Sequence, residues 1–345
     1  MLNISTKHSQ FMNQLYKIGI THGDFNSISY EIILKALSDP KIIEICTPIV
    51  YGLAKASNYY RKLLEMNDFT FQFIKNAQQV TPKKTNLLNL RDDEIKISVG
   101  ETTETAGKMA ELALSTACID LKNKSIDAIV TAPVNKFNMQ SSSFNFAGHT
   151  EFFSAQFNAK DTMMIMVSEL LKVGFVTNHT AINETGKILN LELVLRKIKI
   201  LNDSLVKDFL CTHPKIAVLA FNPHAGDKGL FGNEEINILK PAIKQAFEQS
   251  INAFGPFPAD GFFASGQYTQ FDAVLAMYHD QGMIPFKLLA QESGVNFTAG
   301  LPIVRTSPAH GTGYDIAGKN IASPDAMRNA IYWAIDILNN RKVIL

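Results

Sequence analysis

The chain has 345 residues, of which 46% are hydrophobic and 19% are charged, and its formal net charge is +1. This length and apolar content exclude a wholly disordered protein, and the near-neutral charge provides no broad positive field for nucleic acid or anionic lipid. The three cysteines are too far apart for a disulfide framework or a thiolate metal site. With no long apolar span and no signal-peptide pattern, we expect a cytoplasmic protein that binds neither nucleic acid nor membrane.

Short β-branched runs alternate with longer helical patterns along the chain, which is typical of an α/β fold with a mostly parallel sheet. The expected strands are Ile49–Tyr51, Ile95–Val99, Ile126–Thr131, Val173–Thr177, Ile216–Phe221 and Ala273–Met277. The expected helices are Thr105–Leu121, Lys187–Leu210, Glu234–Gln249 and Met327–Leu338, the last with Ser323 as its cap. The polar stretch Met66–Glu94 is expected to be a surface elaboration.

Three of the eight histidines, His179, His224 and His279, each follow a buried-looking strand. Open α/β sheets bind their ligands at the carboxyl ends of the strands, and parallel strands bring such residues to the same edge. Three neutral imidazoles with an open coordination position suit a catalytic divalent metal ion. The spacings match no compact metal motif, so the alternative that each histidine is a hydrogen-bonded loop residue stays open.

Two carboxylates accompany these histidines. Asp280 directly follows His279, and Asp260 ends the turn-rich segment Gly255–Asp260. Either carboxylate could orient a metal-bound imidazole or move a proton. The alternative is helix capping, which we favour for Asp260 because Gly261–Ala264 follows it.

A second group of residues is suited to an anion. His149 and Thr150 come at the expected start of a helix, where Thr150 can act as the cap and free N–H groups bind phosphate or carboxylate. Lys287, Asn296 and Arg305 come later in the chain. An arginine that ends an apolar run can bind a carboxylate or phosphate with two hydrogen bonds. The alternative is a surface salt bridge, which has equal weight for Lys287 and less weight for Arg305.

The segment Ser307–Pro324 is rich in glycine, which allows a backbone to fold closely around a flat or anionic ligand. It contains neither the G-x-G-x-x-G fingerprint nor a G-x-x-x-x-G-K-[ST] phosphate loop. Any nucleotide must therefore bind in another way.

Taken together, these motifs resemble the 4-hydroxythreonine-4-phosphate dehydrogenases of pyridoxal phosphate biosynthesis. The resemblance runs in order over nearly the whole chain, through Gly148–Phe153, Asn222–Gly226, Gly255–Asp260, Asp272–Gly282, Gly294–Asn296 and Arg305–Ser307. Independently, His310–Thr312 and Asp315–Asn320 are similar to the NAD-binding loop of isopropylmalate and isocitrate dehydrogenases.

The resemblance implies an isopropylmalate-dehydrogenase-like two-domain α/β/α fold, with the active-site cleft between the domains and completed across a homodimer. From the order of the motifs we expect a discontinuous domain, 1–130 plus 295–345, that carries the NAD-binding loop. The segment 131–294 is then the metal, substrate and dimerisation domain.

The resemblance also implies two cofactors, NAD and a divalent metal ion such as zinc, magnesium or cobalt. The implied metal ligands are His179, His224 and His279. The implied substrate contacts are His149, Thr150, Lys287, Asn296 and Arg305. The implied NAD contacts are His310, Gly311, Thr312, Asp315, Lys319 and Asn320. Lys287, Asp280 and Asp260 all remain candidates for the catalytic acid–base group.

The implied reaction begins with hydride transfer to NAD from the secondary alcohol of 4-phosphooxy-L-threonine. The resulting β-keto acid loses carbon dioxide to give 3-amino-2-oxopropyl phosphate. The alternative substrate is a phosphorylated four-carbon sugar acid such as 4-phosphoerythronate, and the alternative class is a metal- or metabolite-binding protein without dehydrogenase activity. One departure from the family is the first loop, where Gly-Asp-Pro-Ala-Gly-Ile-Gly-Pro-Glu is replaced by Gly23–Glu31, which keeps Gly23, Asp24 and Glu31.

Overall fold

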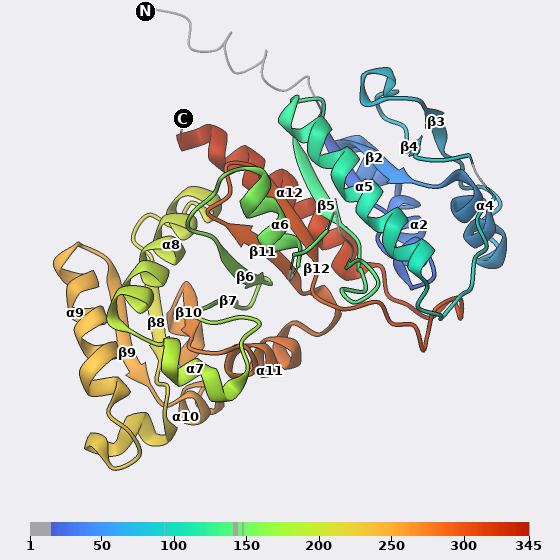
Figure 1. Cartoon of the computed structure of the whole chain (residues 1–345). Coiled ribbons are helices and arrows are strands. Elements are labelled where there is room, and N and C mark those ends of the chain that lie inside the picture. The colour runs from blue at the N-terminus through green and yellow to red at the C-terminus, as the bar shows by residue number, and fades with distance from the viewer. Residues whose placement is uncertain (1–14, 93, 141–143, 147, 345) are drawn as a thin grey trace, which may run out of the picture. The chain divides into compact units, whose positions relative to one another are not determined.

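The computed structural model describes residues 15–92, 94–140, 144–146 and 148–344. The chain divides into two compact units (Figure 1). The first comprises Met1–Asn145 and Ile303–Ile335, and the second comprises Phe146–Pro302 and Asp336–Leu345. The divisions therefore come after 145, 302 and 335, whereas the motif order placed them after 130 and 294.

The first unit contains a parallel sheet with the strand order β3-β4-β2-β1-β5-β12. Its strands are β1 (Tyr16–Thr21), β2 (Cys46–Gly52), β3 (Gln72–Ile74), β4 (Asn86–Asn89), β5 (Ala128–Thr131) and β12 (Val304–Pro308). Its helices are α2 (Ser29–Leu37), α3 (Pro40–Ile45), α4 (Ala54–Leu63), α5 (Glu104–Lys122) and the part of α12 (Asp325–Ile344) up to Ile335. The long helix α5 packs across β1, β2 and β5 (Figure 1).

Two expectations for the first unit are wrong. The segment Ile95–Val99 is not a strand. Ile95 is buried in a cluster with Tyr30 of α2 and Tyr60 of α4, and the apolar side chains of the segment pack on this cluster without strand pairing. The stretch Met66–Glu94 is more than a surface elaboration, since it supplies β3 and β4 and β4 pairs with β2. These two strands are too short for an alternating pattern to be visible in the sequence.

The second unit contains strands in the order β11-β6-β7-β10-β8-β9. Its strands are β6 (Met163–Val167), β7 (Lys172–Phe175), β8 (Lys215–Leu219), β9 (Asn252–Phe257), β10 (Ala273–Ala276) and β11 (Val295–Ala299). Its helices are α6 (His149–Gln156), α7 (Ile182–Ile188), α8 (Leu191–Phe209), α9 (Lys240–Glu248), α10 (Ala259–Ala264) and α11 (His279–Ala290). The strand β6 runs antiparallel to both β7 and β11, and the remaining pairs are parallel.

Two expected helices of this unit are interrupted. The expected helix Lys187–Leu210 is divided into α7 and α8, because Asn190 accepts a hydrogen bond from the backbone N–H of Leu193 at 2.9 Å and so starts a new helix. The expected helix Glu234–Gln249 begins with a π-helical turn over Glu235–Leu239 before α9. The α/β class itself is confirmed. None of the described helices is long and apolar enough to span a membrane.

Candidate functional site

The three histidines that follow strands come from neighbouring strands of the second unit. The strand β10 lies between β7 and β8 and is parallel to both, so the three carboxyl ends meet at one edge. His279 is the first residue of α11, close after β10, and its ring centroid lies 6.3 Å from that of His179. The structure therefore brings two of the three imidazoles together at the predicted edge.

His224 lies on a longer connection after β8, and its ring is 6.0 Å from that of Phe231. Among the described residues, no group of three His, Cys, Asp or Glu side chains is arranged to hold a metal ion. Within the described part of a single chain, the observed pair of neighbouring imidazoles is therefore that of His179 and His279.

The connection that carries His224 is strained. Five consecutive residues have left-handed backbone angles: His224 (φ 54°), Ala225 (52°), Gly226 (76°), Asp227 (40°) and Lys228 (57°). Residues other than glycine in this conformation cost about 1–2 kcal/mol each, and such strain is concentrated at functional sites. The strain must be supported by contacts with the rest of the structure.

Glu235, which is fully buried, fixes the segment that leads into this turn. Its Oε1 accepts hydrogen bonds from the backbone N–H groups of Phe221 (2.8 Å) and Asn222 (2.7 Å), and its Oε2 accepts one from Asn222 Nδ2 (2.9 Å). The sequence placed Glu234 and Glu235 at a helix start, where acids are common, and so missed this role. The pair of adjacent acids was visible in the sequence, but the inward direction of the second, Glu235, was not.

The three acid–base candidates have different surroundings. The Nδ1 of His279 donates a hydrogen bond to Asp280 Oδ1 at 2.6 Å, so Asp280 orients the imidazole and leaves Nε2 for a ligand. Asp260 lies exposed in the first turn of α10, and the favoured capping role is wrong because the cap position is Pro258 and no side chain of the described residues caps this helix. Lys287 is exposed on α11.

Part of the predicted anion site also lies in the second unit. The helix α6 begins at His149 with Gly148 as its cap, so Thr150 lies in the first turn and the expectation that it caps the helix is wrong. Asn296 is on β11, and its Oδ1 is buried without a hydrogen-bond partner among the described residues. The Oδ1 of Asn178, next to His179, is in the same state. Each of these two acceptors is open to a donor from water or from a ligand.

Arg305 belongs to the first unit, where it lies on β12 and is 3% exposed. Its Nε and Nη2 donate hydrogen bonds to Thr131 Oγ1, at 3.2 and 2.7 Å, at the carboxyl end of β5. This burial rules out a surface salt bridge as the role of Arg305. Its guanidinium is held at a strand end, where the sheet of the first unit would bind a ligand.

The glycine-rich loop also belongs to the first unit. Gly313, Gly318 and Asn320 have positive φ values of 51°, 73° and 60°, and a Cβ added at Gly311 would point into open space. Asp315 and Lys319 are exposed. The loop therefore has a tightly turning backbone and accessible charged side chains. Both features are compatible with binding a dinucleotide. Burial and a hydrogen bond to Asp24 raise the pKa of Tyr314 in this loop to about 12.

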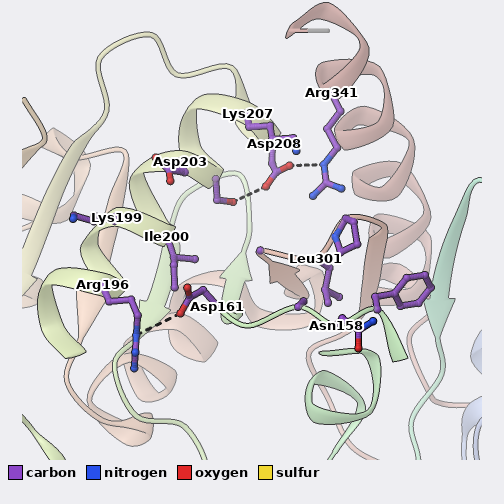
Figure 2. A pocket seen from close by; sticks show the side chains of 15 residues that line it. Asn158, Asp161, Arg196, Lys199, Ile200, Asp203, Lys207, Asp208, Leu301 and Arg341 are labelled. Atoms are coloured by element: carbon purple, nitrogen blue, oxygen red, sulfur yellow. Dashed lines mark hydrogen bonds and ion pairs between the residues drawn. The ribbon is translucent and has the colours of Figure 1, made fainter. Parts of the chain in front are cut away.

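A separate pocket of the second unit, about 720 Å³ in volume, lies beside α8 (Figure 2). It contains the ion pairs Arg196–Asp161 at 3.5 Å and Arg341–Asp208 at 2.7 Å (Figure 2). None of the predicted site residues lines it. The Arg341–Asp208 pair joins α12 to α8, and the Arg196–Asp161 pair joins α8 to the segment before β6.

Comparison with known proteins shows the family of the chain. A sequence profile described as "Pyridoxal phosphate biosynthetic protein PdxA" matches residues 44–334. A 4-hydroxythreonine-4-phosphate dehydrogenase of Bacteroides thetaiotaomicron is 48% identical over 327 residues, covering 94% of this chain and 90% of that protein. A provisionally assigned D-threonate 4-phosphate dehydrogenase of Oceanobacillus iheyensis is 39% identical over 325 residues, covering 93% and 97%.

Solved structures show the same relationship. The crystal structure of a 4-hydroxythreonine-4-phosphate dehydrogenase from Klebsiella pneumoniae has a TM-score of 0.79 and 33% identity, covering 94% of this chain and 99% of that one. Isocitrate dehydrogenase from Methylococcus capsulatus has a TM-score of 0.50 at 13% identity, covering 95% and 87%. The second likeness is one of fold alone, and it agrees with the two-domain α/β fold expected from the sequence.

Proposed function

Because the chain belongs to the PdxA family of pyridoxal phosphate biosynthetic proteins, we propose that it oxidises 4-phosphooxy-L-threonine with NAD in the cytoplasm. Hydride leaves the carbon of the secondary alcohol for NAD, and the β-keto acid then loses carbon dioxide. The products are 3-amino-2-oxopropyl phosphate, carbon dioxide and NADH. The observation that carries the proposal is the 48% identity, over 94% of the chain, to a protein named for this dehydrogenase.

We propose the substrate contacts that the resemblance implies. The guanidinium of Arg305, fixed by Thr131, presents a planar donor fork to a phosphate or carboxylate. The buried Oδ1 of Asn296 needs a donor, and an ammonium or hydroxyl group of the substrate supplies one. His149, Thr150 and Lys287 complete the proposed set, as donors to the anionic groups. Fixing a remote phosphate orients the reacting alcohol.

We further propose that His179, His224 and His279 ligate a divalent metal ion in a homodimer. The pairing of Asp280 with Nδ1 of His279 supports this, because it directs Nε2 to a ligand. The 6.3 Å between the ring centroids of His179 and His279 supports a shared ligand, and we propose that a second copy of the chain completes the site. A bound divalent ion would polarise the substrate hydroxyl and stabilise the negative charge that develops on that oxygen.

The acid–base step is assigned by elimination. Asp280 is engaged with the imidazole of His279, so Lys287 and Asp260 are the groups left to move the proton of the substrate hydroxyl. Replacing Lys287 with Met and Asp260 with Asn in turn, and comparing the pH profile of kcat, distinguishes the two. The variant that loses a titrating limb of the profile identifies the proton carrier.

The test of the function is direct. The purified protein is mixed with 4-phosphooxy-L-threonine, NAD and zinc, cobalt or magnesium, and the absorbance of NADH is followed. Formation of NADH together with carbon dioxide is expected. Absence of NADH with all three metals contradicts the proposal, and failure to bind NAD at equilibrium would instead favour a metal- or metabolite-binding protein.

A second substrate has specific support, because the Oceanobacillus iheyensis relative is assigned to D-threonate 4-phosphate. That compound is a phosphorylated four-carbon sugar acid with a hydroxyl group where 4-phosphooxy-L-threonine has an amine. Both groups can donate to Asn296 Oδ1, so the geometry does not separate them. Comparing kcat/KM for the two substrates decides, and 4-phosphooxy-L-threonine is expected to give the higher value. A higher kcat/KM for D-threonate 4-phosphate would show that the protein is a dehydrogenase of the sugar acid instead.

A further inference from the structure

The first loop of the chain departs from the family pattern, yet it is fully buried at Asp24, Asn26, Ser27 and Ser29. The prolines and glycines of the family pattern are missing, and polar contacts fix the conformation of the loop instead. Ser27 Oγ donates to the Asp24 carbonyl (2.6 Å), and Ser29 Oγ donates to the Pro133 carbonyl (3.0 Å). The Asn26 N–H donates to Asp24 Oδ1 (2.9 Å). The loop is therefore rigid by hydrogen bonding.

This first loop binds the beginning of the glycine-rich loop. The Tyr314 hydroxyl donates to Asp24 Oδ2 at 2.7 Å, and the Ile28 N–H donates to the Thr312 carbonyl at 3.1 Å. Asn138 Nδ2 donates to the same Asp24 oxygen at 2.9 Å. Bonds to a buried carboxylate are stronger than those between neutral groups, so Asp24 is a firm anchor for Tyr314.

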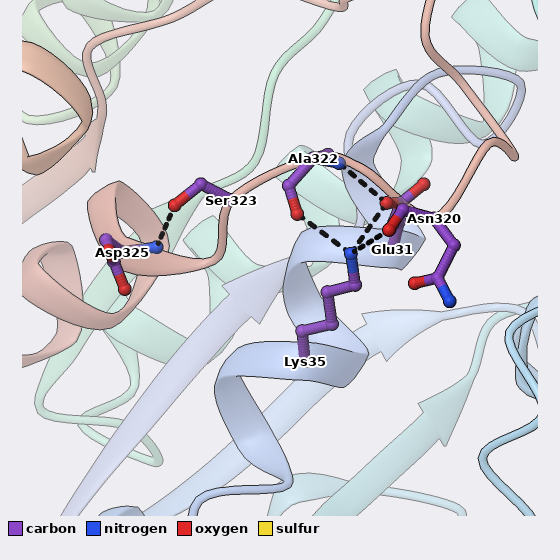
Figure 3. A network of polar contacts seen from close by, with 6 residues as sticks. All are labelled: Glu31, Lys35, Asn320, Ala322, Ser323 and Asp325. Atoms are coloured by element: carbon purple, nitrogen blue, oxygen red, sulfur yellow. Dashed lines mark hydrogen bonds and ion pairs between the residues drawn. The ribbon is translucent and has the colours of Figure 1, made fainter.

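The helix α2, which follows the first loop, binds the end of the glycine-rich loop (Figure 3). The fully buried Glu31 accepts hydrogen bonds at Oε1 from the Ala322 N–H (2.9 Å) and from Lys35 Nζ (2.8 Å). Lys35 Nζ also donates to the carbonyl groups of Asn320 (3.1 Å) and Ala322 (2.9 Å), as Figure 3 shows. The Glu31–Lys35 pair thus holds both polar groups of the Ala322 backbone.

These contacts hold the loop at its two ends and leave its middle accessible. Apart from the Tyr314 hydroxyl, every loop atom that they use is a backbone atom. The side chains of Asp315 and Lys319, between the two anchors, are exposed. The segment Gly23–Lys35, which we call the clasp, therefore fixes the shape of the loop without occupying the side chains expected to bind the dinucleotide.

We propose that Asp24 and Glu31 are positioning residues for the dinucleotide, which act by holding the glycine-rich loop in its binding shape. The inference rests on the proposed function, because it takes this loop as the NAD site. A loop that is ordered before binding does not have to be ordered by the ligand, and this preorganisation increases affinity. Asp24 and Glu31 each hold one end of the loop through charge-assisted hydrogen bonds. Removing the charge of either carboxylate is therefore expected to weaken NADH binding about tenfold.

The test compares three variants of the full chain. Asp24→Asn and Glu31→Gln keep the shape of each side chain and remove its charge. Asp120→Asn is the matched control, because Asp120 Oδ2 accepts a 2.7 Å hydrogen bond from the Tyr51 hydroxyl in the same unit and makes no contact with the loop among the interactions described. NADH binding is measured at equilibrium by fluorescence, and KM for NAD is measured separately from kcat.

The two clasp variants are expected to bind NADH about tenfold more weakly and to raise KM for NAD, with kcat and KM for the phosphorylated substrate within about twofold of the wild type. The control should match the wild type. Hydrogen exchange at the Ala322 amide should accelerate in Glu31→Gln, which shows that the loop is loosened. If a variant does not fold, Tyr314→Phe removes the Asp24 contact with a smaller change.

Equal NADH affinity in the wild type and in both clasp variants overturns the inference, as does an equal loss in Asp120→Asn. If the wild-type protein does not bind NADH at all, the proposed function fails instead. The two failures are therefore distinguishable within one experiment.

Discussion

The connection that carries His224 depends on Glu235, and replacing this residue with glutamine tests that dependence. Glutamine keeps the size of the side chain and replaces one carboxylate oxygen with an NH₂ group. The backbone N–H groups of Phe221 and Asn222 can still bond to the remaining oxygen. The NH₂ group then faces Asn222 Nδ2, which is also a donor. Rotating the Asn222 amide gives no relief, because its Nδ2 also donates to Glu234 Oε2 at 2.7 Å.

The magnitude follows from these contacts. Hydrogen bonds to a charged acceptor contribute about 1.5–3 kcal/mol each, so weakening two of them and losing the third costs about 3 kcal/mol. The left-handed turn stores on the order of 4 kcal/mol, at about 1 kcal/mol or more for each of its four non-glycine residues. The two energies are similar, so the turn is expected to relax in the variant and to move His224. A misplaced ligand lowers metal affinity by about 10- to 100-fold.

The assay is metal affinity by competition with a chromophoric chelator, measured beside the free energy of unfolding in denaturant. Asp208→Asn is the matched control, since Asp208 is also buried and accepts bonds from Arg341 Nε (2.7 Å) and Ser204 Oγ (2.8 Å), in the pocket that contains none of the histidines. Both variants should be destabilised, but the control should retain its metal affinity. Unchanged metal affinity in Glu235→Gln, or an equal loss in Asp208→Asn, refutes the reasoning.

Three further predictions concern the two units separately. Burial lowers the pKa of His22 from 6.5 to about 4, so the unfolded chain binds a proton at a higher pH than the folded chain does. The free energy of unfolding therefore falls as the pH drops from 6.5 to about 4, by about 3 kcal/mol in total. In His22→Gln, the free energy of unfolding measured with denaturant should depend less steeply on pH over this range. The same pH dependence in the variant and the wild type would contradict the lowered pKa of His22. Arg305→Lys should raise the substrate KM about 10- to 100-fold, because one ammonium replaces a planar fork, while NADH affinity stays the same; an unchanged KM in steady-state assays removes Arg305 from the substrate site. Chelation should abolish turnover while the circular dichroism spectrum is retained, and activity that persists after the metal content falls to zero would show that no metal is required.

Much of the fold could be predicted because it follows from local patterns. The β-branched runs at Ile49–Tyr51 and Ala273–Met277 and the helical spacing of Thr105–Leu121 correspond to β2, β10 and α5. Strand order along the sheet could not be predicted this way, because it depends on pairing between distant segments. Ile95–Val99 shows the limit, since an apolar run can be buried by packing on helices as well as by pairing in a sheet.

The sequence by itself determined the α/β class, the strand-end position of His179 and His279, and the family. These depend on hydrophobic periodicity and on short motifs, which are local properties of the chain. The tertiary structure decided which contacts hold the site. Asp24 meets Tyr314 across 290 positions of sequence, and Glu235 holds the turn of His224 by turning inward from a helix start. Such contacts depend on burial and on backbone angles that are set only when distant segments pack together.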